Sequence, residues 1–335
     1  MAGSTPRVRI TDVAKTAGVS LSTVSRVMNG NPTVDPAMAE RVRAVAAELG
    51  YQANPLARSL VLGRTQTIAV VIPDLANPTF QAILRGLSRA AADDGYHVLI
   101  ADSAEQVGDE VDLVSTTRRR TDGVVLCAPR MPADELANLL PTVEPAVVVN
   151  RLPQESAPTV SADYGSAMTE LVEHVHGLGH RRVAYLSGVS GSASGVARAE
   201  ALAAATSAHP DLEIVEIPTG VGFDSGAEVA EQVIESRATA ALAFNDLVAM
   251  GLLSALGARG IRVPEDISVT GFDDIPFAPY TTPPLTTAAV PSVQLGRDAW
   301  TAMRALLDGD AAPDSTLLAP ALVVRESTGP APAQP

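Results

Sequence analysis

The sequence is short of aromatic residues and of cysteine. Phe, Trp and Tyr together make up 3% of its 335 residues, and Cys127 is the one cysteine. A core with so few rings has to be built from Ala, Val, Leu and Ile, and an apolar content of 46% supplies enough of them to exclude a largely disordered chain. One cysteine cannot form an internal disulfide, and it excludes a cysteine-rich metal site.

Long apolar runs are also missing. No uninterrupted apolar stretch reaches the roughly 18 residues that a membrane-spanning helix needs. The polar first ten residues lack the apolar segment of a secretory signal. We therefore expect a cytoplasmic protein that does not enter the membrane, with about two domains and room for a small third.

The charge is unevenly distributed along the chain. Residues 1–66 carry eight basic and four acidic residues, a balance of +4, whereas the rest of the chain has a balance of −18. A basic head on an acidic body suggests a nucleic-acid contact confined to one end. Chance clustering of charge on a solvated face is the alternative.

Beyond residue 66, aliphatic runs of strand length recur at regular intervals with helical patterns between them. They occupy residues 67–72, 97–101, 123–128, 146–150, 182–186, 213–217, 240–244 and 267–270. Continuous rather than alternating aliphatic runs are typical of parallel sheets covered on both faces. We expect two doubly wound α/β subdomains in tandem, with a ligand cleft formed by the carboxyl ends of their strands.

The first 50 residues predict three short helices. Thr11 can cap a helix over residues 12–17, Ser20 can cap one over residues 21–28, and a third follows Asp35 with Pro36 at its first position. A glycine-containing turn between the first two helices is typical of a helix-turn-helix unit, although any small three-helix domain would fit the spacing. Residues 55–62 can form two further helical turns, too short to be stable alone.

Several blocks of sequence carry a resemblance to a known family. They are "ITDVAKTAGVSLSTVSRVMNG", "NPLARSL", "GRTQTIAVVIPDLANPTF", "GHRRVAYLSG", "AFNDLVAMG" and "VPEDISVTGFDD", and they span the chain from about Val8 to about Thr328. On these blocks the chain resembles the lactose/galactose repressor family of bacterial transcription regulators.

The resemblance implies the whole architecture. It implies an all-α helix-turn-helix head over residues 8–52, a hinge helix and linker over 53–66, and a body over 67–330. The body is expected to be periplasmic-binding-protein-like, with two doubly wound parallel-sheet subdomains. An N-lobe would hold about 67–165 and 291–322, and a C-lobe about 166–290 and 323–330.

The resemblance also implies the function. The chain is expected to be a sequence-specific transcriptional repressor that binds a pseudo-palindromic operator as a homodimer. A small effector, a sugar rather than a purine, would bind between the lobes and control operator affinity. No cofactor, metal ion or catalytic residue is expected.

In this family the second helix reads bases in the major groove. Arg26 can contact guanine in bidentate fashion, Leu21 can contact only apolar groups such as a thymine methyl, and Ser22 discriminates weakly. Residues placed for phosphate contacts are Thr11, Ser20, Thr23, Ser25 and Asn29. Ser20 could instead act only as a helix cap.

The hinge residues follow from the same resemblance. Leu60 matches the leucine that family members insert between bases in the minor groove, and Ala57 would let paired hinge helices approach closely. Packing of Leu60 against the body is the alternative.

Polar residues that follow the expected strands match the family's ligand positions. They are Asn77, Phe80, Asn150, Arg151, Ser192, Arg198, Asn245 and Asp273, a set suited to a polyhydroxylated ligand. Asp273 could instead cap a loop, and Arg151 could be a surface charge. Many family members have an acid where this chain has Asn150, so one hydroxyl-binding carboxylate is missing.

Two other classes of function compete with this interpretation. An α/β enzyme would need a nucleophile–base set, which the sequence lacks, and "SGVSGSASG" has no phosphate-loop fingerprint. His174, His176 and His180 do not share a helix face, so no metal site is expected there, and Cys127 falls inside a strand as a buried thiol. A two-lobed sugar receptor without DNA function would share the body but not the basic head.

Overall fold

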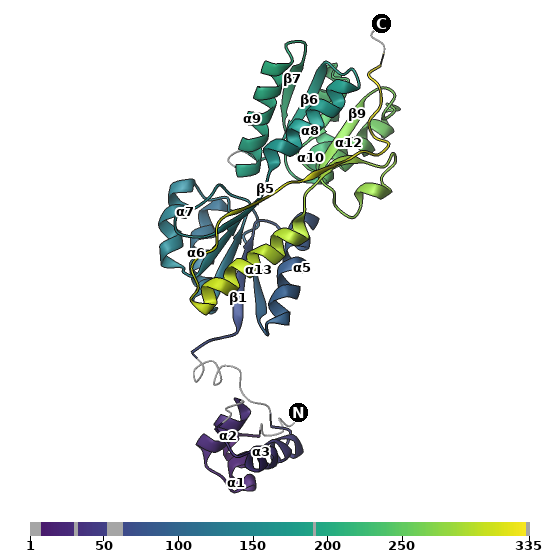
Figure 1. Ribbon diagram of the computed structural model, residues 1–335. Coiled ribbons are helices and arrows are strands. Elements are labelled where there is room, and N and C mark those ends of the chain that lie inside the picture. Colours follow the sequence, from purple (N-terminus) through teal and green to yellow (C-terminus); the bar gives the residue numbers. More distant parts are fainter. Residues whose placement is uncertain (1–7, 30–32, 52–62, 190–191, 333–335) are drawn as a thin grey trace. The chain divides into compact units, whose positions relative to one another are not determined.

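The computed structural model describes residues 8–29, 33–51, 63–189 and 192–332 (Figure 1). The chain forms two compact units, Met1–Gln66 and Thr67–Pro335. Ala57 and Leu60, the two hinge residues singled out by the sequence, lie outside the described residues. Within the described part of the chain, no helix is long and apolar enough to cross a membrane.

The first unit contains the three expected helices, α1 (Ile10–Ala17), α2 (Leu21–Met28) and α3 (Pro36–Glu48). Their inward faces form a small aliphatic core of Val13, Ala14, Ala17, Val24, Val27, Ala39, Val42 and Ala46. Gly18 ends α1 with a φ of 66°, a left-handed conformation that glycine adopts without strain and that opens the turn into α2.

The expected cap of α1 is wrong. The helix begins at Ile10 rather than Asp12, because the carboxylate of Asp12 accepts a hydrogen bond from the backbone N–H of Arg9 at 2.8 Å. Thr11 therefore lies inside the first turn and does not cap the helix. The predicted caps of the other two helices are confirmed: Ser20 accepts from Thr23 N, and Asp35 accepts from Met38 N.

The second unit contains two six-stranded sheets. The first has the order β11-β5-β4-β3-β1-β2, and all of its neighbouring strands are parallel. Its strands are β1 (Thr67–Ile72), β2 (His97–Asp102), β3 (Gly123–Cys127), β4 (Ala146–Val149), β5 (Thr159–Ala162) and β11 (Thr316–Leu318). Its helices are α5 (Pro78–Asp93), α6 (Val107–Arg118), α7 (Ala133–Leu139) with the 3-10 turn Leu140–Thr142, and α13 (Ser292–Asp308).

The second sheet has the order β12-β10-β9-β8-β6-β7, with β12 antiparallel to β10 and the other neighbours parallel. Its strands are β6 (Arg182–Ser187), β7 (Glu213–Pro218), β8 (Ala240–Ala243), β9 (Ser268–Asp273), β10 (Thr286–Ala289) and β12 (Ala321–Val323). Its helices are α8 (Tyr164–Gly177), α9 (Ala193–Ala208), α10 (Phe223–Glu228), α11 (Ala230–Glu235) and α12 (Asp246–Ala258), with a 3-10 turn at Ala278–Tyr280.

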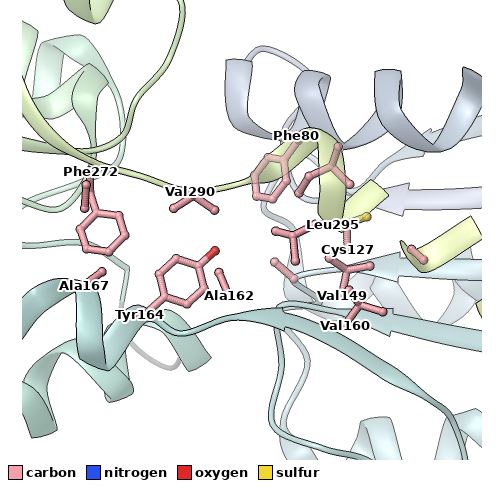
Figure 2. Packing of buried hydrophobic residues seen from close by; sticks show 14 of the residues in the cluster. Phe80, Cys127, Val149, Val160, Ala162, Tyr164, Ala167, Phe272, Val290 and Leu295 are labelled. Carbon is pink, nitrogen blue, oxygen red and sulfur yellow. The ribbon is translucent and has the colours of Figure 1, made fainter. Parts of the chain in front are cut away.

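The chain passes between the two lobes three times, at the β5–α8, β10–α13 and β11–β12 connections (Figure 1). The third passage lies between Leu318 and Ala321, slightly before residue 322, where the sequence placed the change of lobe. One apolar cluster extends across these connections. Figure 2 shows Tyr164 at the first of them, with Phe272 and Ala167 on one side and Phe80 and Val149 on the other.

Helices α5 and α13 pack unusually closely because glycines remove side chains from their contact. A Cβ at Gly296 would lie 2.0 Å from the carbonyl oxygen of Ile83, and one at Gly86 would lie 2.1 Å from that of Val293. Backbone meets backbone at both points. Gly86 and Gly296 therefore fix how α13 packs against α5 of the first lobe.

We expect Gly296→Ala to lower the free energy of unfolding by about 1–3 kcal/mol, because the added methyl group forces the two helices apart. Gly257→Ala is the matched control, since Gly257 is in α12 and a methyl group added there would have nothing within 4 Å. This control should be neutral or stabilising by up to about 1 kcal/mol. Urea denaturation compares the two, and equal effects would contradict the close packing.

Candidate DNA interface and ligand-binding cleft

Helix α2 presents a polar N-terminal end. The hydroxyl of Ser20 accepts from the backbone N–H of Thr23 at 3.1 Å, and the hydroxyls of Ser22 and Thr23 both lie 2.8 Å from the Ser20 oxygen. Ser20 is thus a helix cap, whatever else it contacts. The helix buries Val24 and Val27.

The opposite face of α2 is exposed. Leu21, Ser22 and Arg26 are solvent-accessible, and Leu21 is 48% exposed although it is a large apolar residue. Thr23 and Ser25 are partly buried, and Asn29 donates its side-chain N–H to Ser25 Oγ at 3.4 Å. The predicted DNA contacts of this segment therefore gather on one helix and its ends.

Thr11 belongs to a different helix, exposed in the first turn of α1, and its predicted phosphate contact stays a prediction.

Seven of the eight residues predicted to bind the ligand line one cavity in the second unit. They are Asn77, Phe80, Asn150, Arg151, Arg198, Asn245 and Asp273. Each lies at or just beyond the carboxyl end of a strand, or in the helix that follows it, and both sheets contribute. The cavity lies where doubly wound sheets of this strand order bind ligands, beside the points at which the strand order reverses.

Ser192 does not line this cavity. Its hydroxyl accepts from the backbone N–H of Gly195 at 3.1 Å and caps α9, and the neighbouring Ala193 and Ser194 form the wall instead. The Ser192 hydroxyl accepts in this cap and can still donate a hydrogen bond, so its predicted ligand contact stays a prediction.

Three polar residues of the first lobe line the cavity and also hydrogen-bond to nearby backbone groups. Asn77 Oδ1 accepts from Thr79 N at 2.9 Å, and Asn150 Oδ1 accepts from Ala162 N at 3.2 Å. Arg151 donates to the carbonyl of Pro129 at 3.0 Å. Both asparagines thus use their side-chain oxygens to fix the backbone around the cavity.

A charged pair in the same wall was not predicted from the sequence. Arg130 donates through Nε and Nη2 to the two oxygens of Glu105, at 2.8 and 2.9 Å, and both residues line the cavity. The buried carboxylate of Glu110 holds the loop by accepting from the backbone N–H groups of Arg130 and Met131 at 2.9 and 2.7 Å. Burial raises the pKa of Glu110 despite these two hydrogen bonds.

The second lobe contributes a buried positive charge. Arg198 is 2% exposed, and its guanidinium carbon lies 3.8, 4.5 and 5.0 Å from the ring centres of Phe272, Phe244 and Tyr164. Its Nη1 donates to the carbonyl of Phe244 at 2.8 Å. Three aromatic faces and one carbonyl thus replace part of the water that the charge has lost.

The Nε atom of Arg198 is buried without a hydrogen-bond partner among the described residues. A buried N–H group left unpaired costs about 1–3 kcal/mol. A ligand oxygen in the cavity would supply the missing acceptor.

Asp273 provides the opposite charge. It ends β9 with a φ of 106°, an unusual backbone conformation for a side-chain-bearing residue and one that tends to occur at functional sites. The hydroxyl of Thr79, from the first lobe, donates to Asp273 Oδ2 at 2.8 Å. Burial raises the pKa of Asp273 to about 6, against the opposing influence of Arg198 and of the Thr79 hydrogen bond.

A second carboxylate supports the loop after Asp273. Asp246 is fully buried and accepts from the hydroxyl of Thr287 at 2.6 Å and from the backbone N–H of Ile275 at 2.8 Å. Burial, reinforced by the neighbouring charge of Asp273, raises the pKa of Asp246 to about 8. The sequence reasoning missed this residue, although it follows Asn245 directly.

Two models of known protein families match this chain, one in each of its two units. Residues 9–54 match the model of the bacterial regulatory proteins of the lacI family, and residues 172–328 match a periplasmic binding protein-like domain. The HTH-type transcriptional repressor CytR of Escherichia coli (strain K12) is 32% identical over 329 residues, which is 95% of this chain and 95% of that protein. The chain belongs to the LacI family of bacterial regulatory proteins.

Solved structures of other regulators share the fold of this LacI-family chain. A crystal structure of the Lac repressor dimer bound to operator and the anti-inducer ONPF has a TM-score of 0.86 at 27% identity, covering 96% of this chain and 99% of that one. A complex of the transcriptional regulator CelR with cellobiose has a TM-score of 0.69 at 28% identity, covering 96% and 100%. The predicted family, fold class and role as a DNA-binding transcriptional regulator are confirmed.

The raised pKa of Asp246 in this LacI-family regulator makes its stability depend on pH. A carboxyl whose pKa rises from 3.8 to about 8 on folding favours the folded state fully below pH 4, and this contribution is lost as the pH rises towards 8. We expect the unfolding free energy of the wild type to fall relative to that of Asp246→Asn over this range, by at most about 1.4 kcal/mol per pH unit.

Urea denaturation at several pH values measures the difference. The exposed Asp112 offers a control, because Asp112→Asn should leave the wild-type profile unchanged. Parallel profiles for the wild type and Asp246→Asn would refute the burial of an uncharged Asp246.

Proposed function

We propose that this regulator is a repressor whose affinity for operator DNA is set by a sugar bound between Arg198 and Asp273. The observation that carries the proposal is the pairing of a buried, incompletely hydrogen-bonded guanidinium with a cavity-lining carboxylate. No direct ion pair joins these two residues in the described structure. Their charges are therefore available to a ligand placed between them.

The chemistry of the cavity favours a polyhydroxylated ligand. A sugar hydroxyl both donates and accepts, so it can satisfy Asp273 as donor and Arg198 or Arg151 as acceptor. The ring of Phe80 adds an apolar face to the same wall. The cellobiose bound to CelR shows a sugar held by a related regulator and supports the same class here.

Both lobes would respond to the ligand. The hydrogen bond from Thr79 to Asp273 joins them across the cavity, and three chain crossings connect them. A ligand that takes over Asp273 releases Thr79, so it stabilises one arrangement of the lobes over another. The expected hinge over residues 53–66 would carry this change to the head, with Leu60 as the minor-groove wedge and Ala57 at the contact of two hinge helices.

A homodimer on a pseudo-palindromic operator completes the proposal. The Lac repressor was crystallised as a dimer on its operator, which supports the same assembly. This chain also exposes the apolar side chains of Leu99 and Ile100 on edge strand β2 and of Val107 at the start of α6, which a second copy would cover. A repressor acts on DNA and therefore in the cytoplasm, and we assign it no catalysis and no cofactor.

A two-lobed sugar receptor without DNA function is distinguished by truncation. Removing residues 1–62 should abolish operator binding and leave ligand binding unchanged under the repressor proposal. Full-length protein that selects no DNA sequence from a random pool would refute it.

Arg26 is expected to read a base from the exposed face of α2. Arg26→Ala should relax the preference at one symmetric pair of operator positions, with a loss of discrimination of about 1–3 kcal/mol. Selection of binding sites from random DNA measures this. Arg43→Ala, which removes an exposed arginine of α3, should leave the consensus unchanged; an unchanged consensus for Arg26→Ala would contradict the assignment.

Ligand affinity should depend on the ionisation of Asp273. The pKa of about 6 leaves the carboxylate charged above pH 7, so affinity should be constant there and fall below pH 6, by up to about tenfold per pH unit. Asp273→Asn should bind the ligand at least tenfold more weakly, lose this pH dependence and keep operator affinity.

Calorimetric titration with the sugar that most raises the thermal midpoint gives both quantities. The matched control is Asp274→Asn, because Asp274 is paired with Arg325 at 2.7 Å and lies outside the cavity wall. An Asp273→Asn variant with wild-type affinity would place the ligand elsewhere.

A further inference from the structure

Two histidines and two carboxylates meet at the C-terminal ends of α8 and α9. His176 lies in the last turn of α8, His209 is the C-cap of α9, and their ring centres are 4.0 Å apart. His209 Nε2 is 2.7 Å from Glu173 Oε1, and His176 Nε2 is 3.2 Å from Asp211 Oδ1. All four residues are at least partly exposed.

The remaining histidines of this region are committed to other contacts. His174 Nε2 lies 3.0 Å from Thr328 Oγ1, and the two ring nitrogens of His180 lie within 3.0 Å of Thr239 Oγ1 and the carbonyl of Gly329. No metal was expected here from the sequence, because the three neighbouring histidines do not share a face. The fold instead brings His176 to a histidine from another helix.

We propose that Glu173, His176 and His209 bind a Zn²⁺ ion, with Asp211 as a fourth ligand. One ligand atom from each of the first three residues lies within 4.8 Å of the others. Around a tetrahedral zinc with bonds of about 2.0–2.2 Å, ligand atoms lie about 3.3 Å apart. The side chains are partly exposed, and the proposal has them rotate to reach this spacing.

The nature of the ligands selects the class of metal. Two imidazoles with carboxylates suit Zn²⁺ and similar divalent transition metals, whereas Mg²⁺ and Ca²⁺ prefer oxygen ligands alone. Each imidazole must offer an unprotonated Nε2, which a neutral ring does by carrying its proton on Nδ1. Metal binding then replaces the two hydrogen bonds that the carboxylates make to the rings.

The electrostatic surroundings contain both favourable and opposing groups. The C-terminal ends of two helices carry partial negative charge and attract a cation. Arg181 opposes it, because its Nε lies 2.6 Å from Asp211 Oδ2. Only the other oxygen of Asp211 faces His176, so we assign Asp211 the weakest of the four contacts.

The site would clamp two helices that also reach the cleft. Both helices begin at the cavity: Tyr164 opens α8, and Ala193 and Ser194 open α9. The helices pack against each other between these ends and the histidines (Figure 1). A metal ion at their far ends would thus hold together a pair whose near ends form the ligand wall. Zinc binding itself does not depend on the effector.

Isothermal titration of ZnCl₂ into untagged, metal-stripped full-length protein tests the proposal. We expect one ion per chain with micromolar affinity, a higher thermal midpoint with zinc, and no saturable binding of MgCl₂. His209→Ala and His176→Gln should each weaken binding at least tenfold, and Glu173→Gln should weaken it less.

The exposed His97 on β2 provides the control, because His97→Ala removes a histidine far from the cluster in sequence and should keep wild-type zinc affinity. Unchanged thermal midpoints without zinc verify that the variants fold. Absence of saturable zinc binding by the wild type overturns the proposal, as does wild-type affinity in His209→Ala.

Discussion

The buried charge of Arg198 is the constraint on which the cavity depends. A guanidinium removed from water needs compensation, and the chain supplies it with the faces of Tyr164, Phe244 and Phe272. The sequence contains only five Phe and five Tyr, so three of its few rings surround one side chain. Three of the few aromatic side chains are therefore committed to the surroundings of this one charge.

The two sheets place this charge in the wall of the cavity. In each sheet the strand order reverses beside the first strand, and the loops at the carboxyl ends open into the cavity. Asp273 from the second lobe accepts a hydrogen bond from Thr79 of the first, so the site is assembled from both lobes. Under the proposed function, a ligand competing for the same carboxylate would act directly on the contact between the lobes.

Much of this arrangement could be predicted because it follows from local rules. Continuous aliphatic runs indicated the strands β1–β4 and β6–β9, and the family resemblance, applied to residues after those strands, indicated seven cavity residues. Strands β5, β10, β11 and β12 were not predicted. Thr or Ser interrupts the aliphatic run in β5 and β10, and β11 and β12 are three-residue strands at the sheet edges.

Other features could not be read from the sequence, for physical reasons. A serine before a helix is suited both to capping and to binding; Ser192 caps α9, and it is the neighbouring Ala193 and Ser194 that line the cavity. The pairing of Glu105 with Arg130 was not predicted, because the two residues lie 25 positions apart in different loops. Likewise, 36 residues separate Glu173 from His209, so only the packing of α8 on α9 reveals their proximity.

The most direct test is a crystal structure of the full chain with the sugar that most stabilises it. We predict one sugar ring within hydrogen-bonding distance of both Arg198 and Asp273, with the Thr79–Asp273 hydrogen bond replaced. A sugar held by one lobe alone, or bound outside the cavity, would contradict a ligand shared between these two charges.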